Sequence, residues 1–92
     1  MGIKMEKRIG LLFAEGQIKE AIEMLEQEVK LQESEEKLLL LGELYYKEGR
    51  SVDALNKFNA VLKINPVNKK AAAYVTMIND VFDFYHKDLL NP

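Results

Sequence analysis

Apolar residues along this chain return every three or four positions, and no run of strict alternation is bounded by turn residues. A three-to-four-residue period places apolar side chains on one side of an α-helix, whereas alternation is typical of a β-strand. The pattern therefore predicts an all-α protein with five helices. Their expected limits are about 3–14, from after Gly16 to about 31, from Ser34 to Gly49, from Ser51 to near Asn65, and from about Asn68 to beyond Tyr85.

The expected helix ends rest on a few residues with strong local preferences. Gly16 and Gly49 can adopt the left-handed conformation that terminates a helix. Ser34 and Ser51 can cap the N-termini of the third and fourth helices, because a serine oxygen accepts a free amide of the first turn. Pro66 lacks an amide donor and disfavours helical dihedrals in the residue before it, so the fourth helix must end near Asn65.

The same period predicts the residues that face the core. In chain order the expected core residues are Met5, Ile9, Leu12, Phe13, Ile18, Ala21, Ile22, Leu25, Val29, Leu38, Leu41, Leu44, Tyr45, Val52, Leu55, Phe58, Val61 and Leu62. Connections of two to four residues between these helices require neighbouring helices to run antiparallel.

The first two helices and the next two are written with one pattern. Three pairs of matching positions lie 33 residues apart: Gly16 and Gly49, Ala21 and Ala54, Leu25 and Phe58. Repeats of this length are usually supersecondary units that bury their apolar faces by stacking on one another. The chain therefore looks like one unit used twice, followed by a longer last helix.

The second copy resembles the tetratricopeptide repeat, a helix-turn-helix unit of about 34 residues. The positions that carry the resemblance are Leu38, Leu41, Gly42, Tyr45, Gly49, Ala54, Phe58, Val61 and Pro66. Leu38 replaces the usual Trp and Val61 replaces the usual second Ala, and both remain apolar. In the first copy Ile9 and Leu12 replace a Gly and a Tyr. The resemblance implies an α-solenoid fragment with repeats at about 2–33 and 35–66 and a capping helix at about 68–88.

The last helix does not continue the repeat in register. Continuing the spacing would place Thr76 and Asn79 in the core, so we expect this helix to be rotated. Its wide apolar face also suggests contact with the third helix or with another chain. One interpretation is a helix that shields the end of the array. The alternative is a homodimer formed through Met77, Val81 and Phe84.

In tetratricopeptide repeats the first helix of each unit lines a concave surface that receives a peptide or helix of another protein. The resemblance implies a peptide-binding groove lined by Ile3, Glu6, Gly10, Phe13, Glu36, Leu39, Glu43, Tyr46 and Lys47. Phe13, Leu39 and Tyr46 would contact an apolar side chain of the partner. Glu6 and Glu43 would favour a partner with Lys or Arg. Alternatively, Phe13 and Leu39 pack against each other or under the last helix.

Composition argues against several other functions. The chain carries 13 basic and 15 acidic residues, a net charge of −2, and the charges alternate along the sequence. We therefore expect no nucleic-acid partner and no membrane partner. With no cysteine and His86 as the only histidine, we expect no metal site, no cofactor and no catalytic dyad. Because no signal-length or membrane-spanning apolar segment occurs, we expect a cytoplasmic protein.

Two functional hypotheses follow. The first is a non-catalytic adaptor that binds a peptide or helix of another protein in the groove. The second is a self-association module in which the last helix packs against its own copy. An enzyme is not expected, since no set of perturbed titratable groups can be assembled from these residues.

Overall fold

The computed structural model of the chain describes residues 17–90, and the side chains of residues 17–85. Its helices are α2 (Ile18–Leu31), α3 (Glu35–Lys47), α4 (Ser51–Ile64) and α5 (Lys69–Leu90). The remaining described residues form turns and short connections without a strand, so the all-α prediction is confirmed over this range. The helix expected at residues 3–14, and Gly16 after it, lie outside the described residues.

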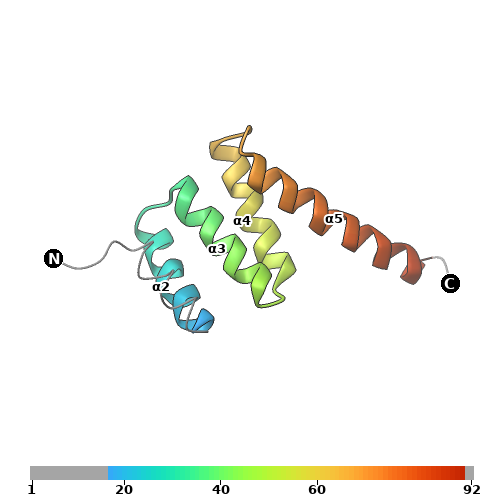
Figure 1. Ribbon diagram of the computed structural model, residues 1–92, viewed down its shortest axis with the longest axis horizontal. Coiled ribbons are helices and arrows are strands. Elements are labelled where there is room, and N and C mark those ends of the chain that lie inside the picture. The colour runs from blue at the N-terminus through green and yellow to red at the C-terminus, as the bar shows by residue number, and fades with distance from the viewer. Residues whose placement is uncertain (1–16, 91–92) are drawn as a thin grey trace.

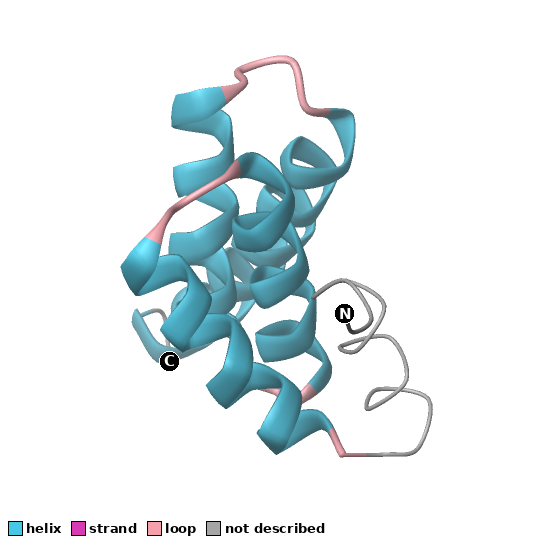
Figure 2. Ribbon diagram, turned by 90° about the vertical axis from the view of Figure 1, so that its left-hand side faces the viewer, coloured by secondary structure: helices cyan, strands magenta, loops and turns pink. Residues whose placement is uncertain are grey.

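The four helices follow one another up and down, with their connections at alternate ends (Figure 1). Helix α3 packs against both α2 and α4, and α5 packs against α4. Seen from the side, the helices lie alongside one another, with the loops at their ends (Figure 2). The antiparallel arrangement that the short connections predicted is therefore present.

Most of the expected helix ends are confirmed. Ser34 caps α3, since its Oγ accepts a hydrogen bond from the amide of Lys37 at 3.2 Å. Gly49 follows α3 with a φ of 79°, in the left-handed region. Asn65 ends α4 immediately before Pro66.

The prediction that Ser51 caps the fourth helix is wrong, because Ser51 is the first residue of α4. Arg50 precedes the helix and supplies no capping hydrogen bond from its side chain. The Nε of Arg50 instead donates to the carboxylate of Asp53 at 2.9 Å. The helix therefore begins with an arginine–aspartate pair across its first turn, an arrangement that the serine cap rule does not describe.

Within residues 17–85 the core lies where the helical period placed it, with one exception; the expected core residues Met5, Ile9, Leu12 and Phe13 lie outside the described residues. Its buried residues are Ala21, Ile22, Leu25, Leu38, Leu41, Leu44, Tyr45, Ala54, Phe58, Val61, Ala71 and Ile78. Ile18, Val29, Leu55 and Leu62 are partly buried and pack against this core. Val52 was expected in the core but is 63% exposed, because it lies about 120° around α4 from the buried Phe58 and so faces away from the core.

Gly42 allows α3 and α4 to approach closely. A β-carbon built on Gly42 would lie 2.7 Å from Cε1 of Phe58, which is closer than non-bonded carbon atoms approach. Phe58 and Ala54 on α4 are both fully buried at this contact. The small residues that the repeat pattern singled out therefore create the space that the Phe58 ring fills.

Helix α5 is rotated as expected and is longer than the helices it follows. Ala71 and Ile78 are buried, whereas Thr76 and Asn79 are exposed. The helix has 22 residues, against 14 in α4. Its C-terminal part extends beyond the other helices (Figure 1), so the residues after Phe82 leave the packed body.

Candidate interaction surface

The start of α5 is fixed to the start of α3 through one carboxylate. Glu35 Oε2 accepts hydrogen bonds from the side-chain amides of Asn65 at 2.7 Å and Asn68 at 2.6 Å. Asn68 also caps α5, because its Oδ1 accepts from the amide of Ala71 at 2.9 Å. The Asn68 and Asn65 donors lower the pKa of Glu35 below its ordinary value. This network aligns the N-termini of α3 and α5 side by side.

Further along the two helices, Glu43 of α3 is held by two residues of α5. Its Oε2 lies 3.2 Å from Nζ of Lys70 and accepts the hydroxyl of Tyr74, also at 3.2 Å. Burial, followed by the charge of Glu43, raises the pKa of Tyr74. The contact between the last helix and α3 that the wide apolar face suggested is therefore confirmed.

Aromatic side chains continue this contact between α3 and α5. The Tyr74 ring stacks on Phe58, with centroids 4.4 Å apart, and meets Tyr46 edge-on at 5.4 Å. The Tyr46 hydroxyl lies 3.7 Å from the sulfur of Met77. Tyr74 therefore joins the buried core to the surface, where Tyr46 and Met77 lie beside each other.

Beyond Tyr46, α5 carries large apolar side chains that remain substantially exposed among the described residues. We define the α5 strip as Met77, Val81 and Phe84, the residues that the sequence suggested for a dimer. They are 41%, 46% and 64% exposed, respectively. Tyr85 is next to the strip, with its ring centroid 5.7 Å from that of Phe84. Spacings of three and four residues place the strip on one side of the helix.

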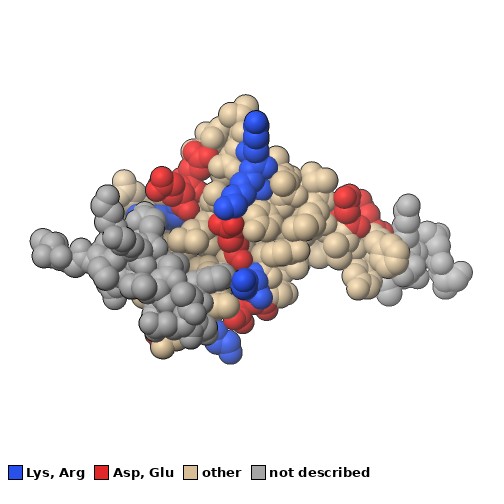
Figure 3. Space-filling view, viewed as in Figure 1, with Lys and Arg blue, Asp and Glu red and all other residues tan. Residues whose placement is uncertain are grey.

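The outward side of α5 is also shallowly hollowed. The residues that line this open depression are Lys69, Ala72, Ala73, Thr76, Met77, Asp80 and Val81. Small side chains occupy its N-terminal half, and larger ones follow toward the C-terminus. In the view of Figure 3 a column of basic and acidic side chains crosses the middle of the molecule. An uncharged area lies to its right, and acidic side chains appear further toward the C-terminal half of α5.

The groove residues expected on α3 are only partly available to a partner. Glu36 and Lys47 are exposed and Tyr46 is 37% exposed. Leu39, expected to be exposed, is partly buried against the core. Glu43 already binds Lys70 and Tyr74. Four further predicted positions lie outside the described residues: Ile3, Glu6, Gly10 and Phe13.

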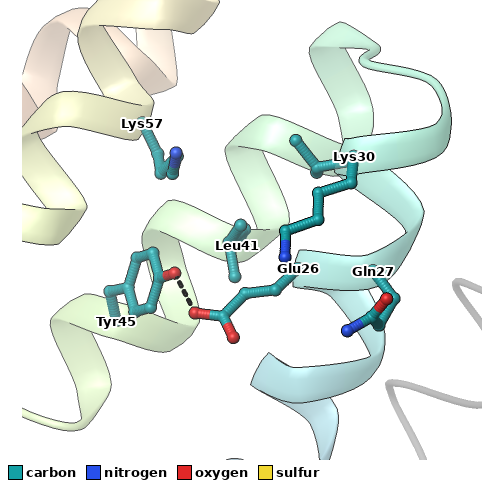
Figure 4. A pocket seen from close by; sticks show the side chains of 7 residues that line it. Glu26, Gln27, Lys30, Leu41, Tyr45 and Lys57 are labelled. Atoms are coloured by element: carbon teal, nitrogen blue, oxygen red, sulfur yellow. Dashed lines mark hydrogen bonds between the residues drawn. The ribbon is translucent and has the colours of Figure 1, made fainter.

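A separate cavity of about 350 Å³ is lined by residues of α2, α3 and α4, among them Leu41 and Tyr45. In Figure 4 the carboxylate of Glu26, on α2, points to the Tyr45 hydroxyl and accepts its hydrogen bond. Lys30 and Lys57 extend over the same space. Burial, followed by the hydrogen bond to Glu26, raises the pKa of Tyr45 well above its ordinary value. Tyr45 therefore keeps its proton at neutral pH and acts as a donor that fastens α2 to α3.

Within residues 17–90, no helix is long and apolar enough to cross a membrane. The described residues also contain no cluster of three or more side chains suited to hold a metal ion. No protein-family model, curated protein or solved structure matches this chain.

The apolar residues of the α5 strip can be predicted from the sequence, whereas the residues that surround the strip cannot. Lys69, Ala72 and Ala73 have ordinary side chains for a helix surface. Asp80 is exposed and lies beside Met77 and Val81 in the lining of the depression. The missed signal is the order of side chains along α5, from basic and small to large and acidic.

Proposed function

We propose that this chain is a non-catalytic protein-interaction module of the tetratricopeptide type that acts in the cytoplasm. It binds an apolar segment of a protein partner along the α5 strip and the neighbouring Tyr46. The repeated positions, the close contact of Gly42 with Phe58 and the helix-turn-helix pairing support a tetratricopeptide arrangement. In this arrangement α3 and α5 correspond to the first helices of successive units, which in that family line the binding surface.

The observation that carries the proposal is the exposure of the α5 strip. Buried side-chain polar atoms of the described residues all have hydrogen-bond partners, so the packed helices leave no buried polar side chain without a hydrogen bond. The same protein leaves three large apolar side chains, and Tyr85 beside them, open along a single helix. A contiguous apolar patch with a polar edge marks an interaction site more often than scattered exposed residues do.

The polar edge of the strip indicates the chemistry of the partner. Asp80 and Asp83 are exposed, and neither forms an ion pair with another described residue. Glu43, the expected acidic selector on α3, is already neutralised by Lys70. We therefore assign selection of a basic residue in the partner to Asp80 and Asp83, with burial of an apolar side chain against Met77, Val81 and Phe84.

Site-specific photo-crosslinking tests this function. Phe84 is replaced by the photoreactive analogue p-benzoylphenylalanine in cells that express the chain, and crosslinked products are identified by mass spectrometry. The control carries the analogue at Asn59, an exposed position on α4. We expect a discrete protein adduct at position 84 that is absent at position 59 and disappears when Val81→Glu is added. Equal products at both positions, or none at position 84, would contradict the proposal.

A further inference from the structure

The outward face of α5 carries a basic and an acidic residue at equal distances from Thr76. Lys69 lies seven residues before Thr76, and Asp83 lies seven residues after it. Seven residues make almost two full helical turns, so the three residues form one stripe along the helix. All three are exposed, and neither Lys69 nor Asp83 forms an ion pair with another described residue.

We infer that the partner of this face is a second copy of the chain, with the two α5 helices packed antiparallel around a two-fold axis near Thr76. This inference rests on the proposed function. The second copy covers Met77 and Phe84 of the α5 strip from one side, because both lie about 80–100° around the helix from Thr76, whereas Val81 lies about 140° away and outside the contact. Around such an axis Thr76 lies beside its own copy. Lys69 of each chain then lies beside Asp83 of the other, and Asp80 is within one turn of the same contact.

The apolar side chains match in the same arrangement. Met77 lies near the axis, and in an antiparallel pair it packs on Ala73 of the second copy, whose small side chain leaves room for it. Phe84 follows Thr76 by eight residues, and Val67 precedes Thr76 by nine. Phe84 of one copy therefore lies level with the N-terminal end of α5 in the other copy, next to the turn that carries Val67. Both are strongly exposed in the single chain, at 64% and 80%.

The face of α5 that carries Lys69, Thr76 and Asp83 is accessible, because α5 packs on the other helices through its opposite side. Ala71 and Ile78, which are buried toward the other helices, lie on the opposite side of α5 from Ala73 and Asp80. Lys70 and Tyr74 turn toward Glu43 on α3, so they lie at the edge of the face. A second helix can therefore approach without displacing α3 or α4, and the small side chains of Ala72 and Ala73 allow the two helix axes to come close.

The order of the charges favours a second copy over an unrelated cationic partner. A partner selected by Asp80 and Asp83 alone would leave Lys69 without a counter-charge. A helix that pairs both charges needs an acidic residue opposite Lys69 and a basic residue opposite Asp83. The same face of a second copy in antiparallel orientation provides both. One helix pair reaches only the lower end of specific interfaces, about 1,200 Å² in total, which is the size of weak and transient complexes, so we expect a reversible dimer.

Charge reversal in the purified chain tests this arrangement. We expect analytical ultracentrifugation of the native chain to show a concentration-dependent transition from the 10.6 kDa monomer to a dimer. Lys69→Glu places two acidic residues together at both ends of the interface, and Asp83→Lys places two lysines there. Each change alone should weaken the homodimer by about tenfold, an estimate from two exposed charge pairs per dimer. The double variant should restore it.

Mixing the two single variants gives the decisive result. A Lys69→Glu chain and an Asp83→Lys chain have complementary charges at both ends, so the mixture should dimerise about as tightly as the native protein. Lys63→Glu and Glu23→Lys make the same charge changes on exposed parts of α4 and α2, and they should leave dimerisation unchanged. Circular dichroism confirms that every variant retains its helices.

Three results would overturn this inference: a monomer at all concentrations, single variants that dimerise like the native chain, or a mixture no tighter than its components. A monomer that still forms a heterologous adduct at position 84 would remove the second copy and leave the proposed function standing. A monomer without any such adduct would remove both.

Discussion

Phe58 and Phe84 show how differently one type of side chain is used in the two parts of this molecule. Phe58 is completely buried between α3, α4 and α5, where it stacks on Tyr74 and fills the space beside Gly42. Phe84 lies on the C-terminal part of α5 and is 64% exposed. The packed body therefore uses its aromatic residues for folding, whereas the end of α5 keeps them available for another surface.

Replacing each phenylalanine by alanine gives the largest expected difference. Phe58→Ala should lower the free energy of unfolding by about 4 kcal/mol, since it removes a buried ring and leaves a cavity. Phe84→Ala should change that of the monomer by less than about 0.5 kcal/mol. Urea unfolding followed by circular dichroism, at concentrations below any association, measures both. Similar losses for the two variants would show that the end of α5 is part of the cooperative core.

The close contact of Gly42 with Phe58 predicts a smaller loss of stability than Phe58→Ala causes. Gly42→Ala should destabilise the chain by about 1–2 kcal/mol, because the new methyl group meets the Phe58 ring and outweighs the gain in helix propensity. In a Phe58→Leu background the same change should cost less, since the ring is gone. A double-mutant cycle from urea unfolding measures this coupling. Additive effects would mean that the ring and the glycine do not limit each other.

Several helix ends and the rotation of α5 could be predicted from the sequence. Ser34, Gly49 and Pro66 act through local geometry, so their roles follow from residue type and position. The rotation of α5 was predictable because Thr76 and Asn79 would otherwise be buried without partners.

Other features depend on neighbours that are distant in the sequence. Leu39 is partly buried, and Glu43 binds Lys70 and Tyr74, because α5 packs beside α3 at a particular height. The candidate surface was therefore predicted on α5, where the unpaired apolar residues mark it directly. On α3 it was predicted incompletely.

Tyr45 predicts a loss of stability in alkaline solution. Its pKa is raised in the folded chain, so above about pH 10 the unfolded chain releases the phenolic proton while the folded chain keeps it. The free energy of unfolding should therefore decrease as the pH rises above 10. Tyr45→Phe should remove the part of this dependence that Tyr45 causes, whereas Tyr74, whose pKa is also raised, keeps its own part. The substitution should have a moderate cost at neutral pH, since Glu26 loses its donor. Urea unfolding between pH 8 and 11 measures the slope, and an unchanged slope in the variant would contradict the assignment.

Glu35 predicts the smallest effect, at the acidic end. Its pKa is lowered in the folded chain by Asn68 and Asn65, so its contribution is present above pH 4.5 and is lost as the pH falls through the folded value. Glu35→Gln should flatten the acidic limb of the stability curve. Glu36→Gln, at the exposed neighbouring position, is the matched control and should leave that limb as in the native chain.

The length of α5 gives the packing around Tyr74 a mechanical consequence. Eleven residues of helix separate Tyr74 from Tyr85, which corresponds to an arm of about 16 Å. A tilt of about 10° at Tyr74 would displace the far end by about 3 Å, roughly the radius of a side-chain contact. Substitutions at the Tyr74 anchor, far from any bound molecule, should therefore shift the position of whatever lies against Phe84.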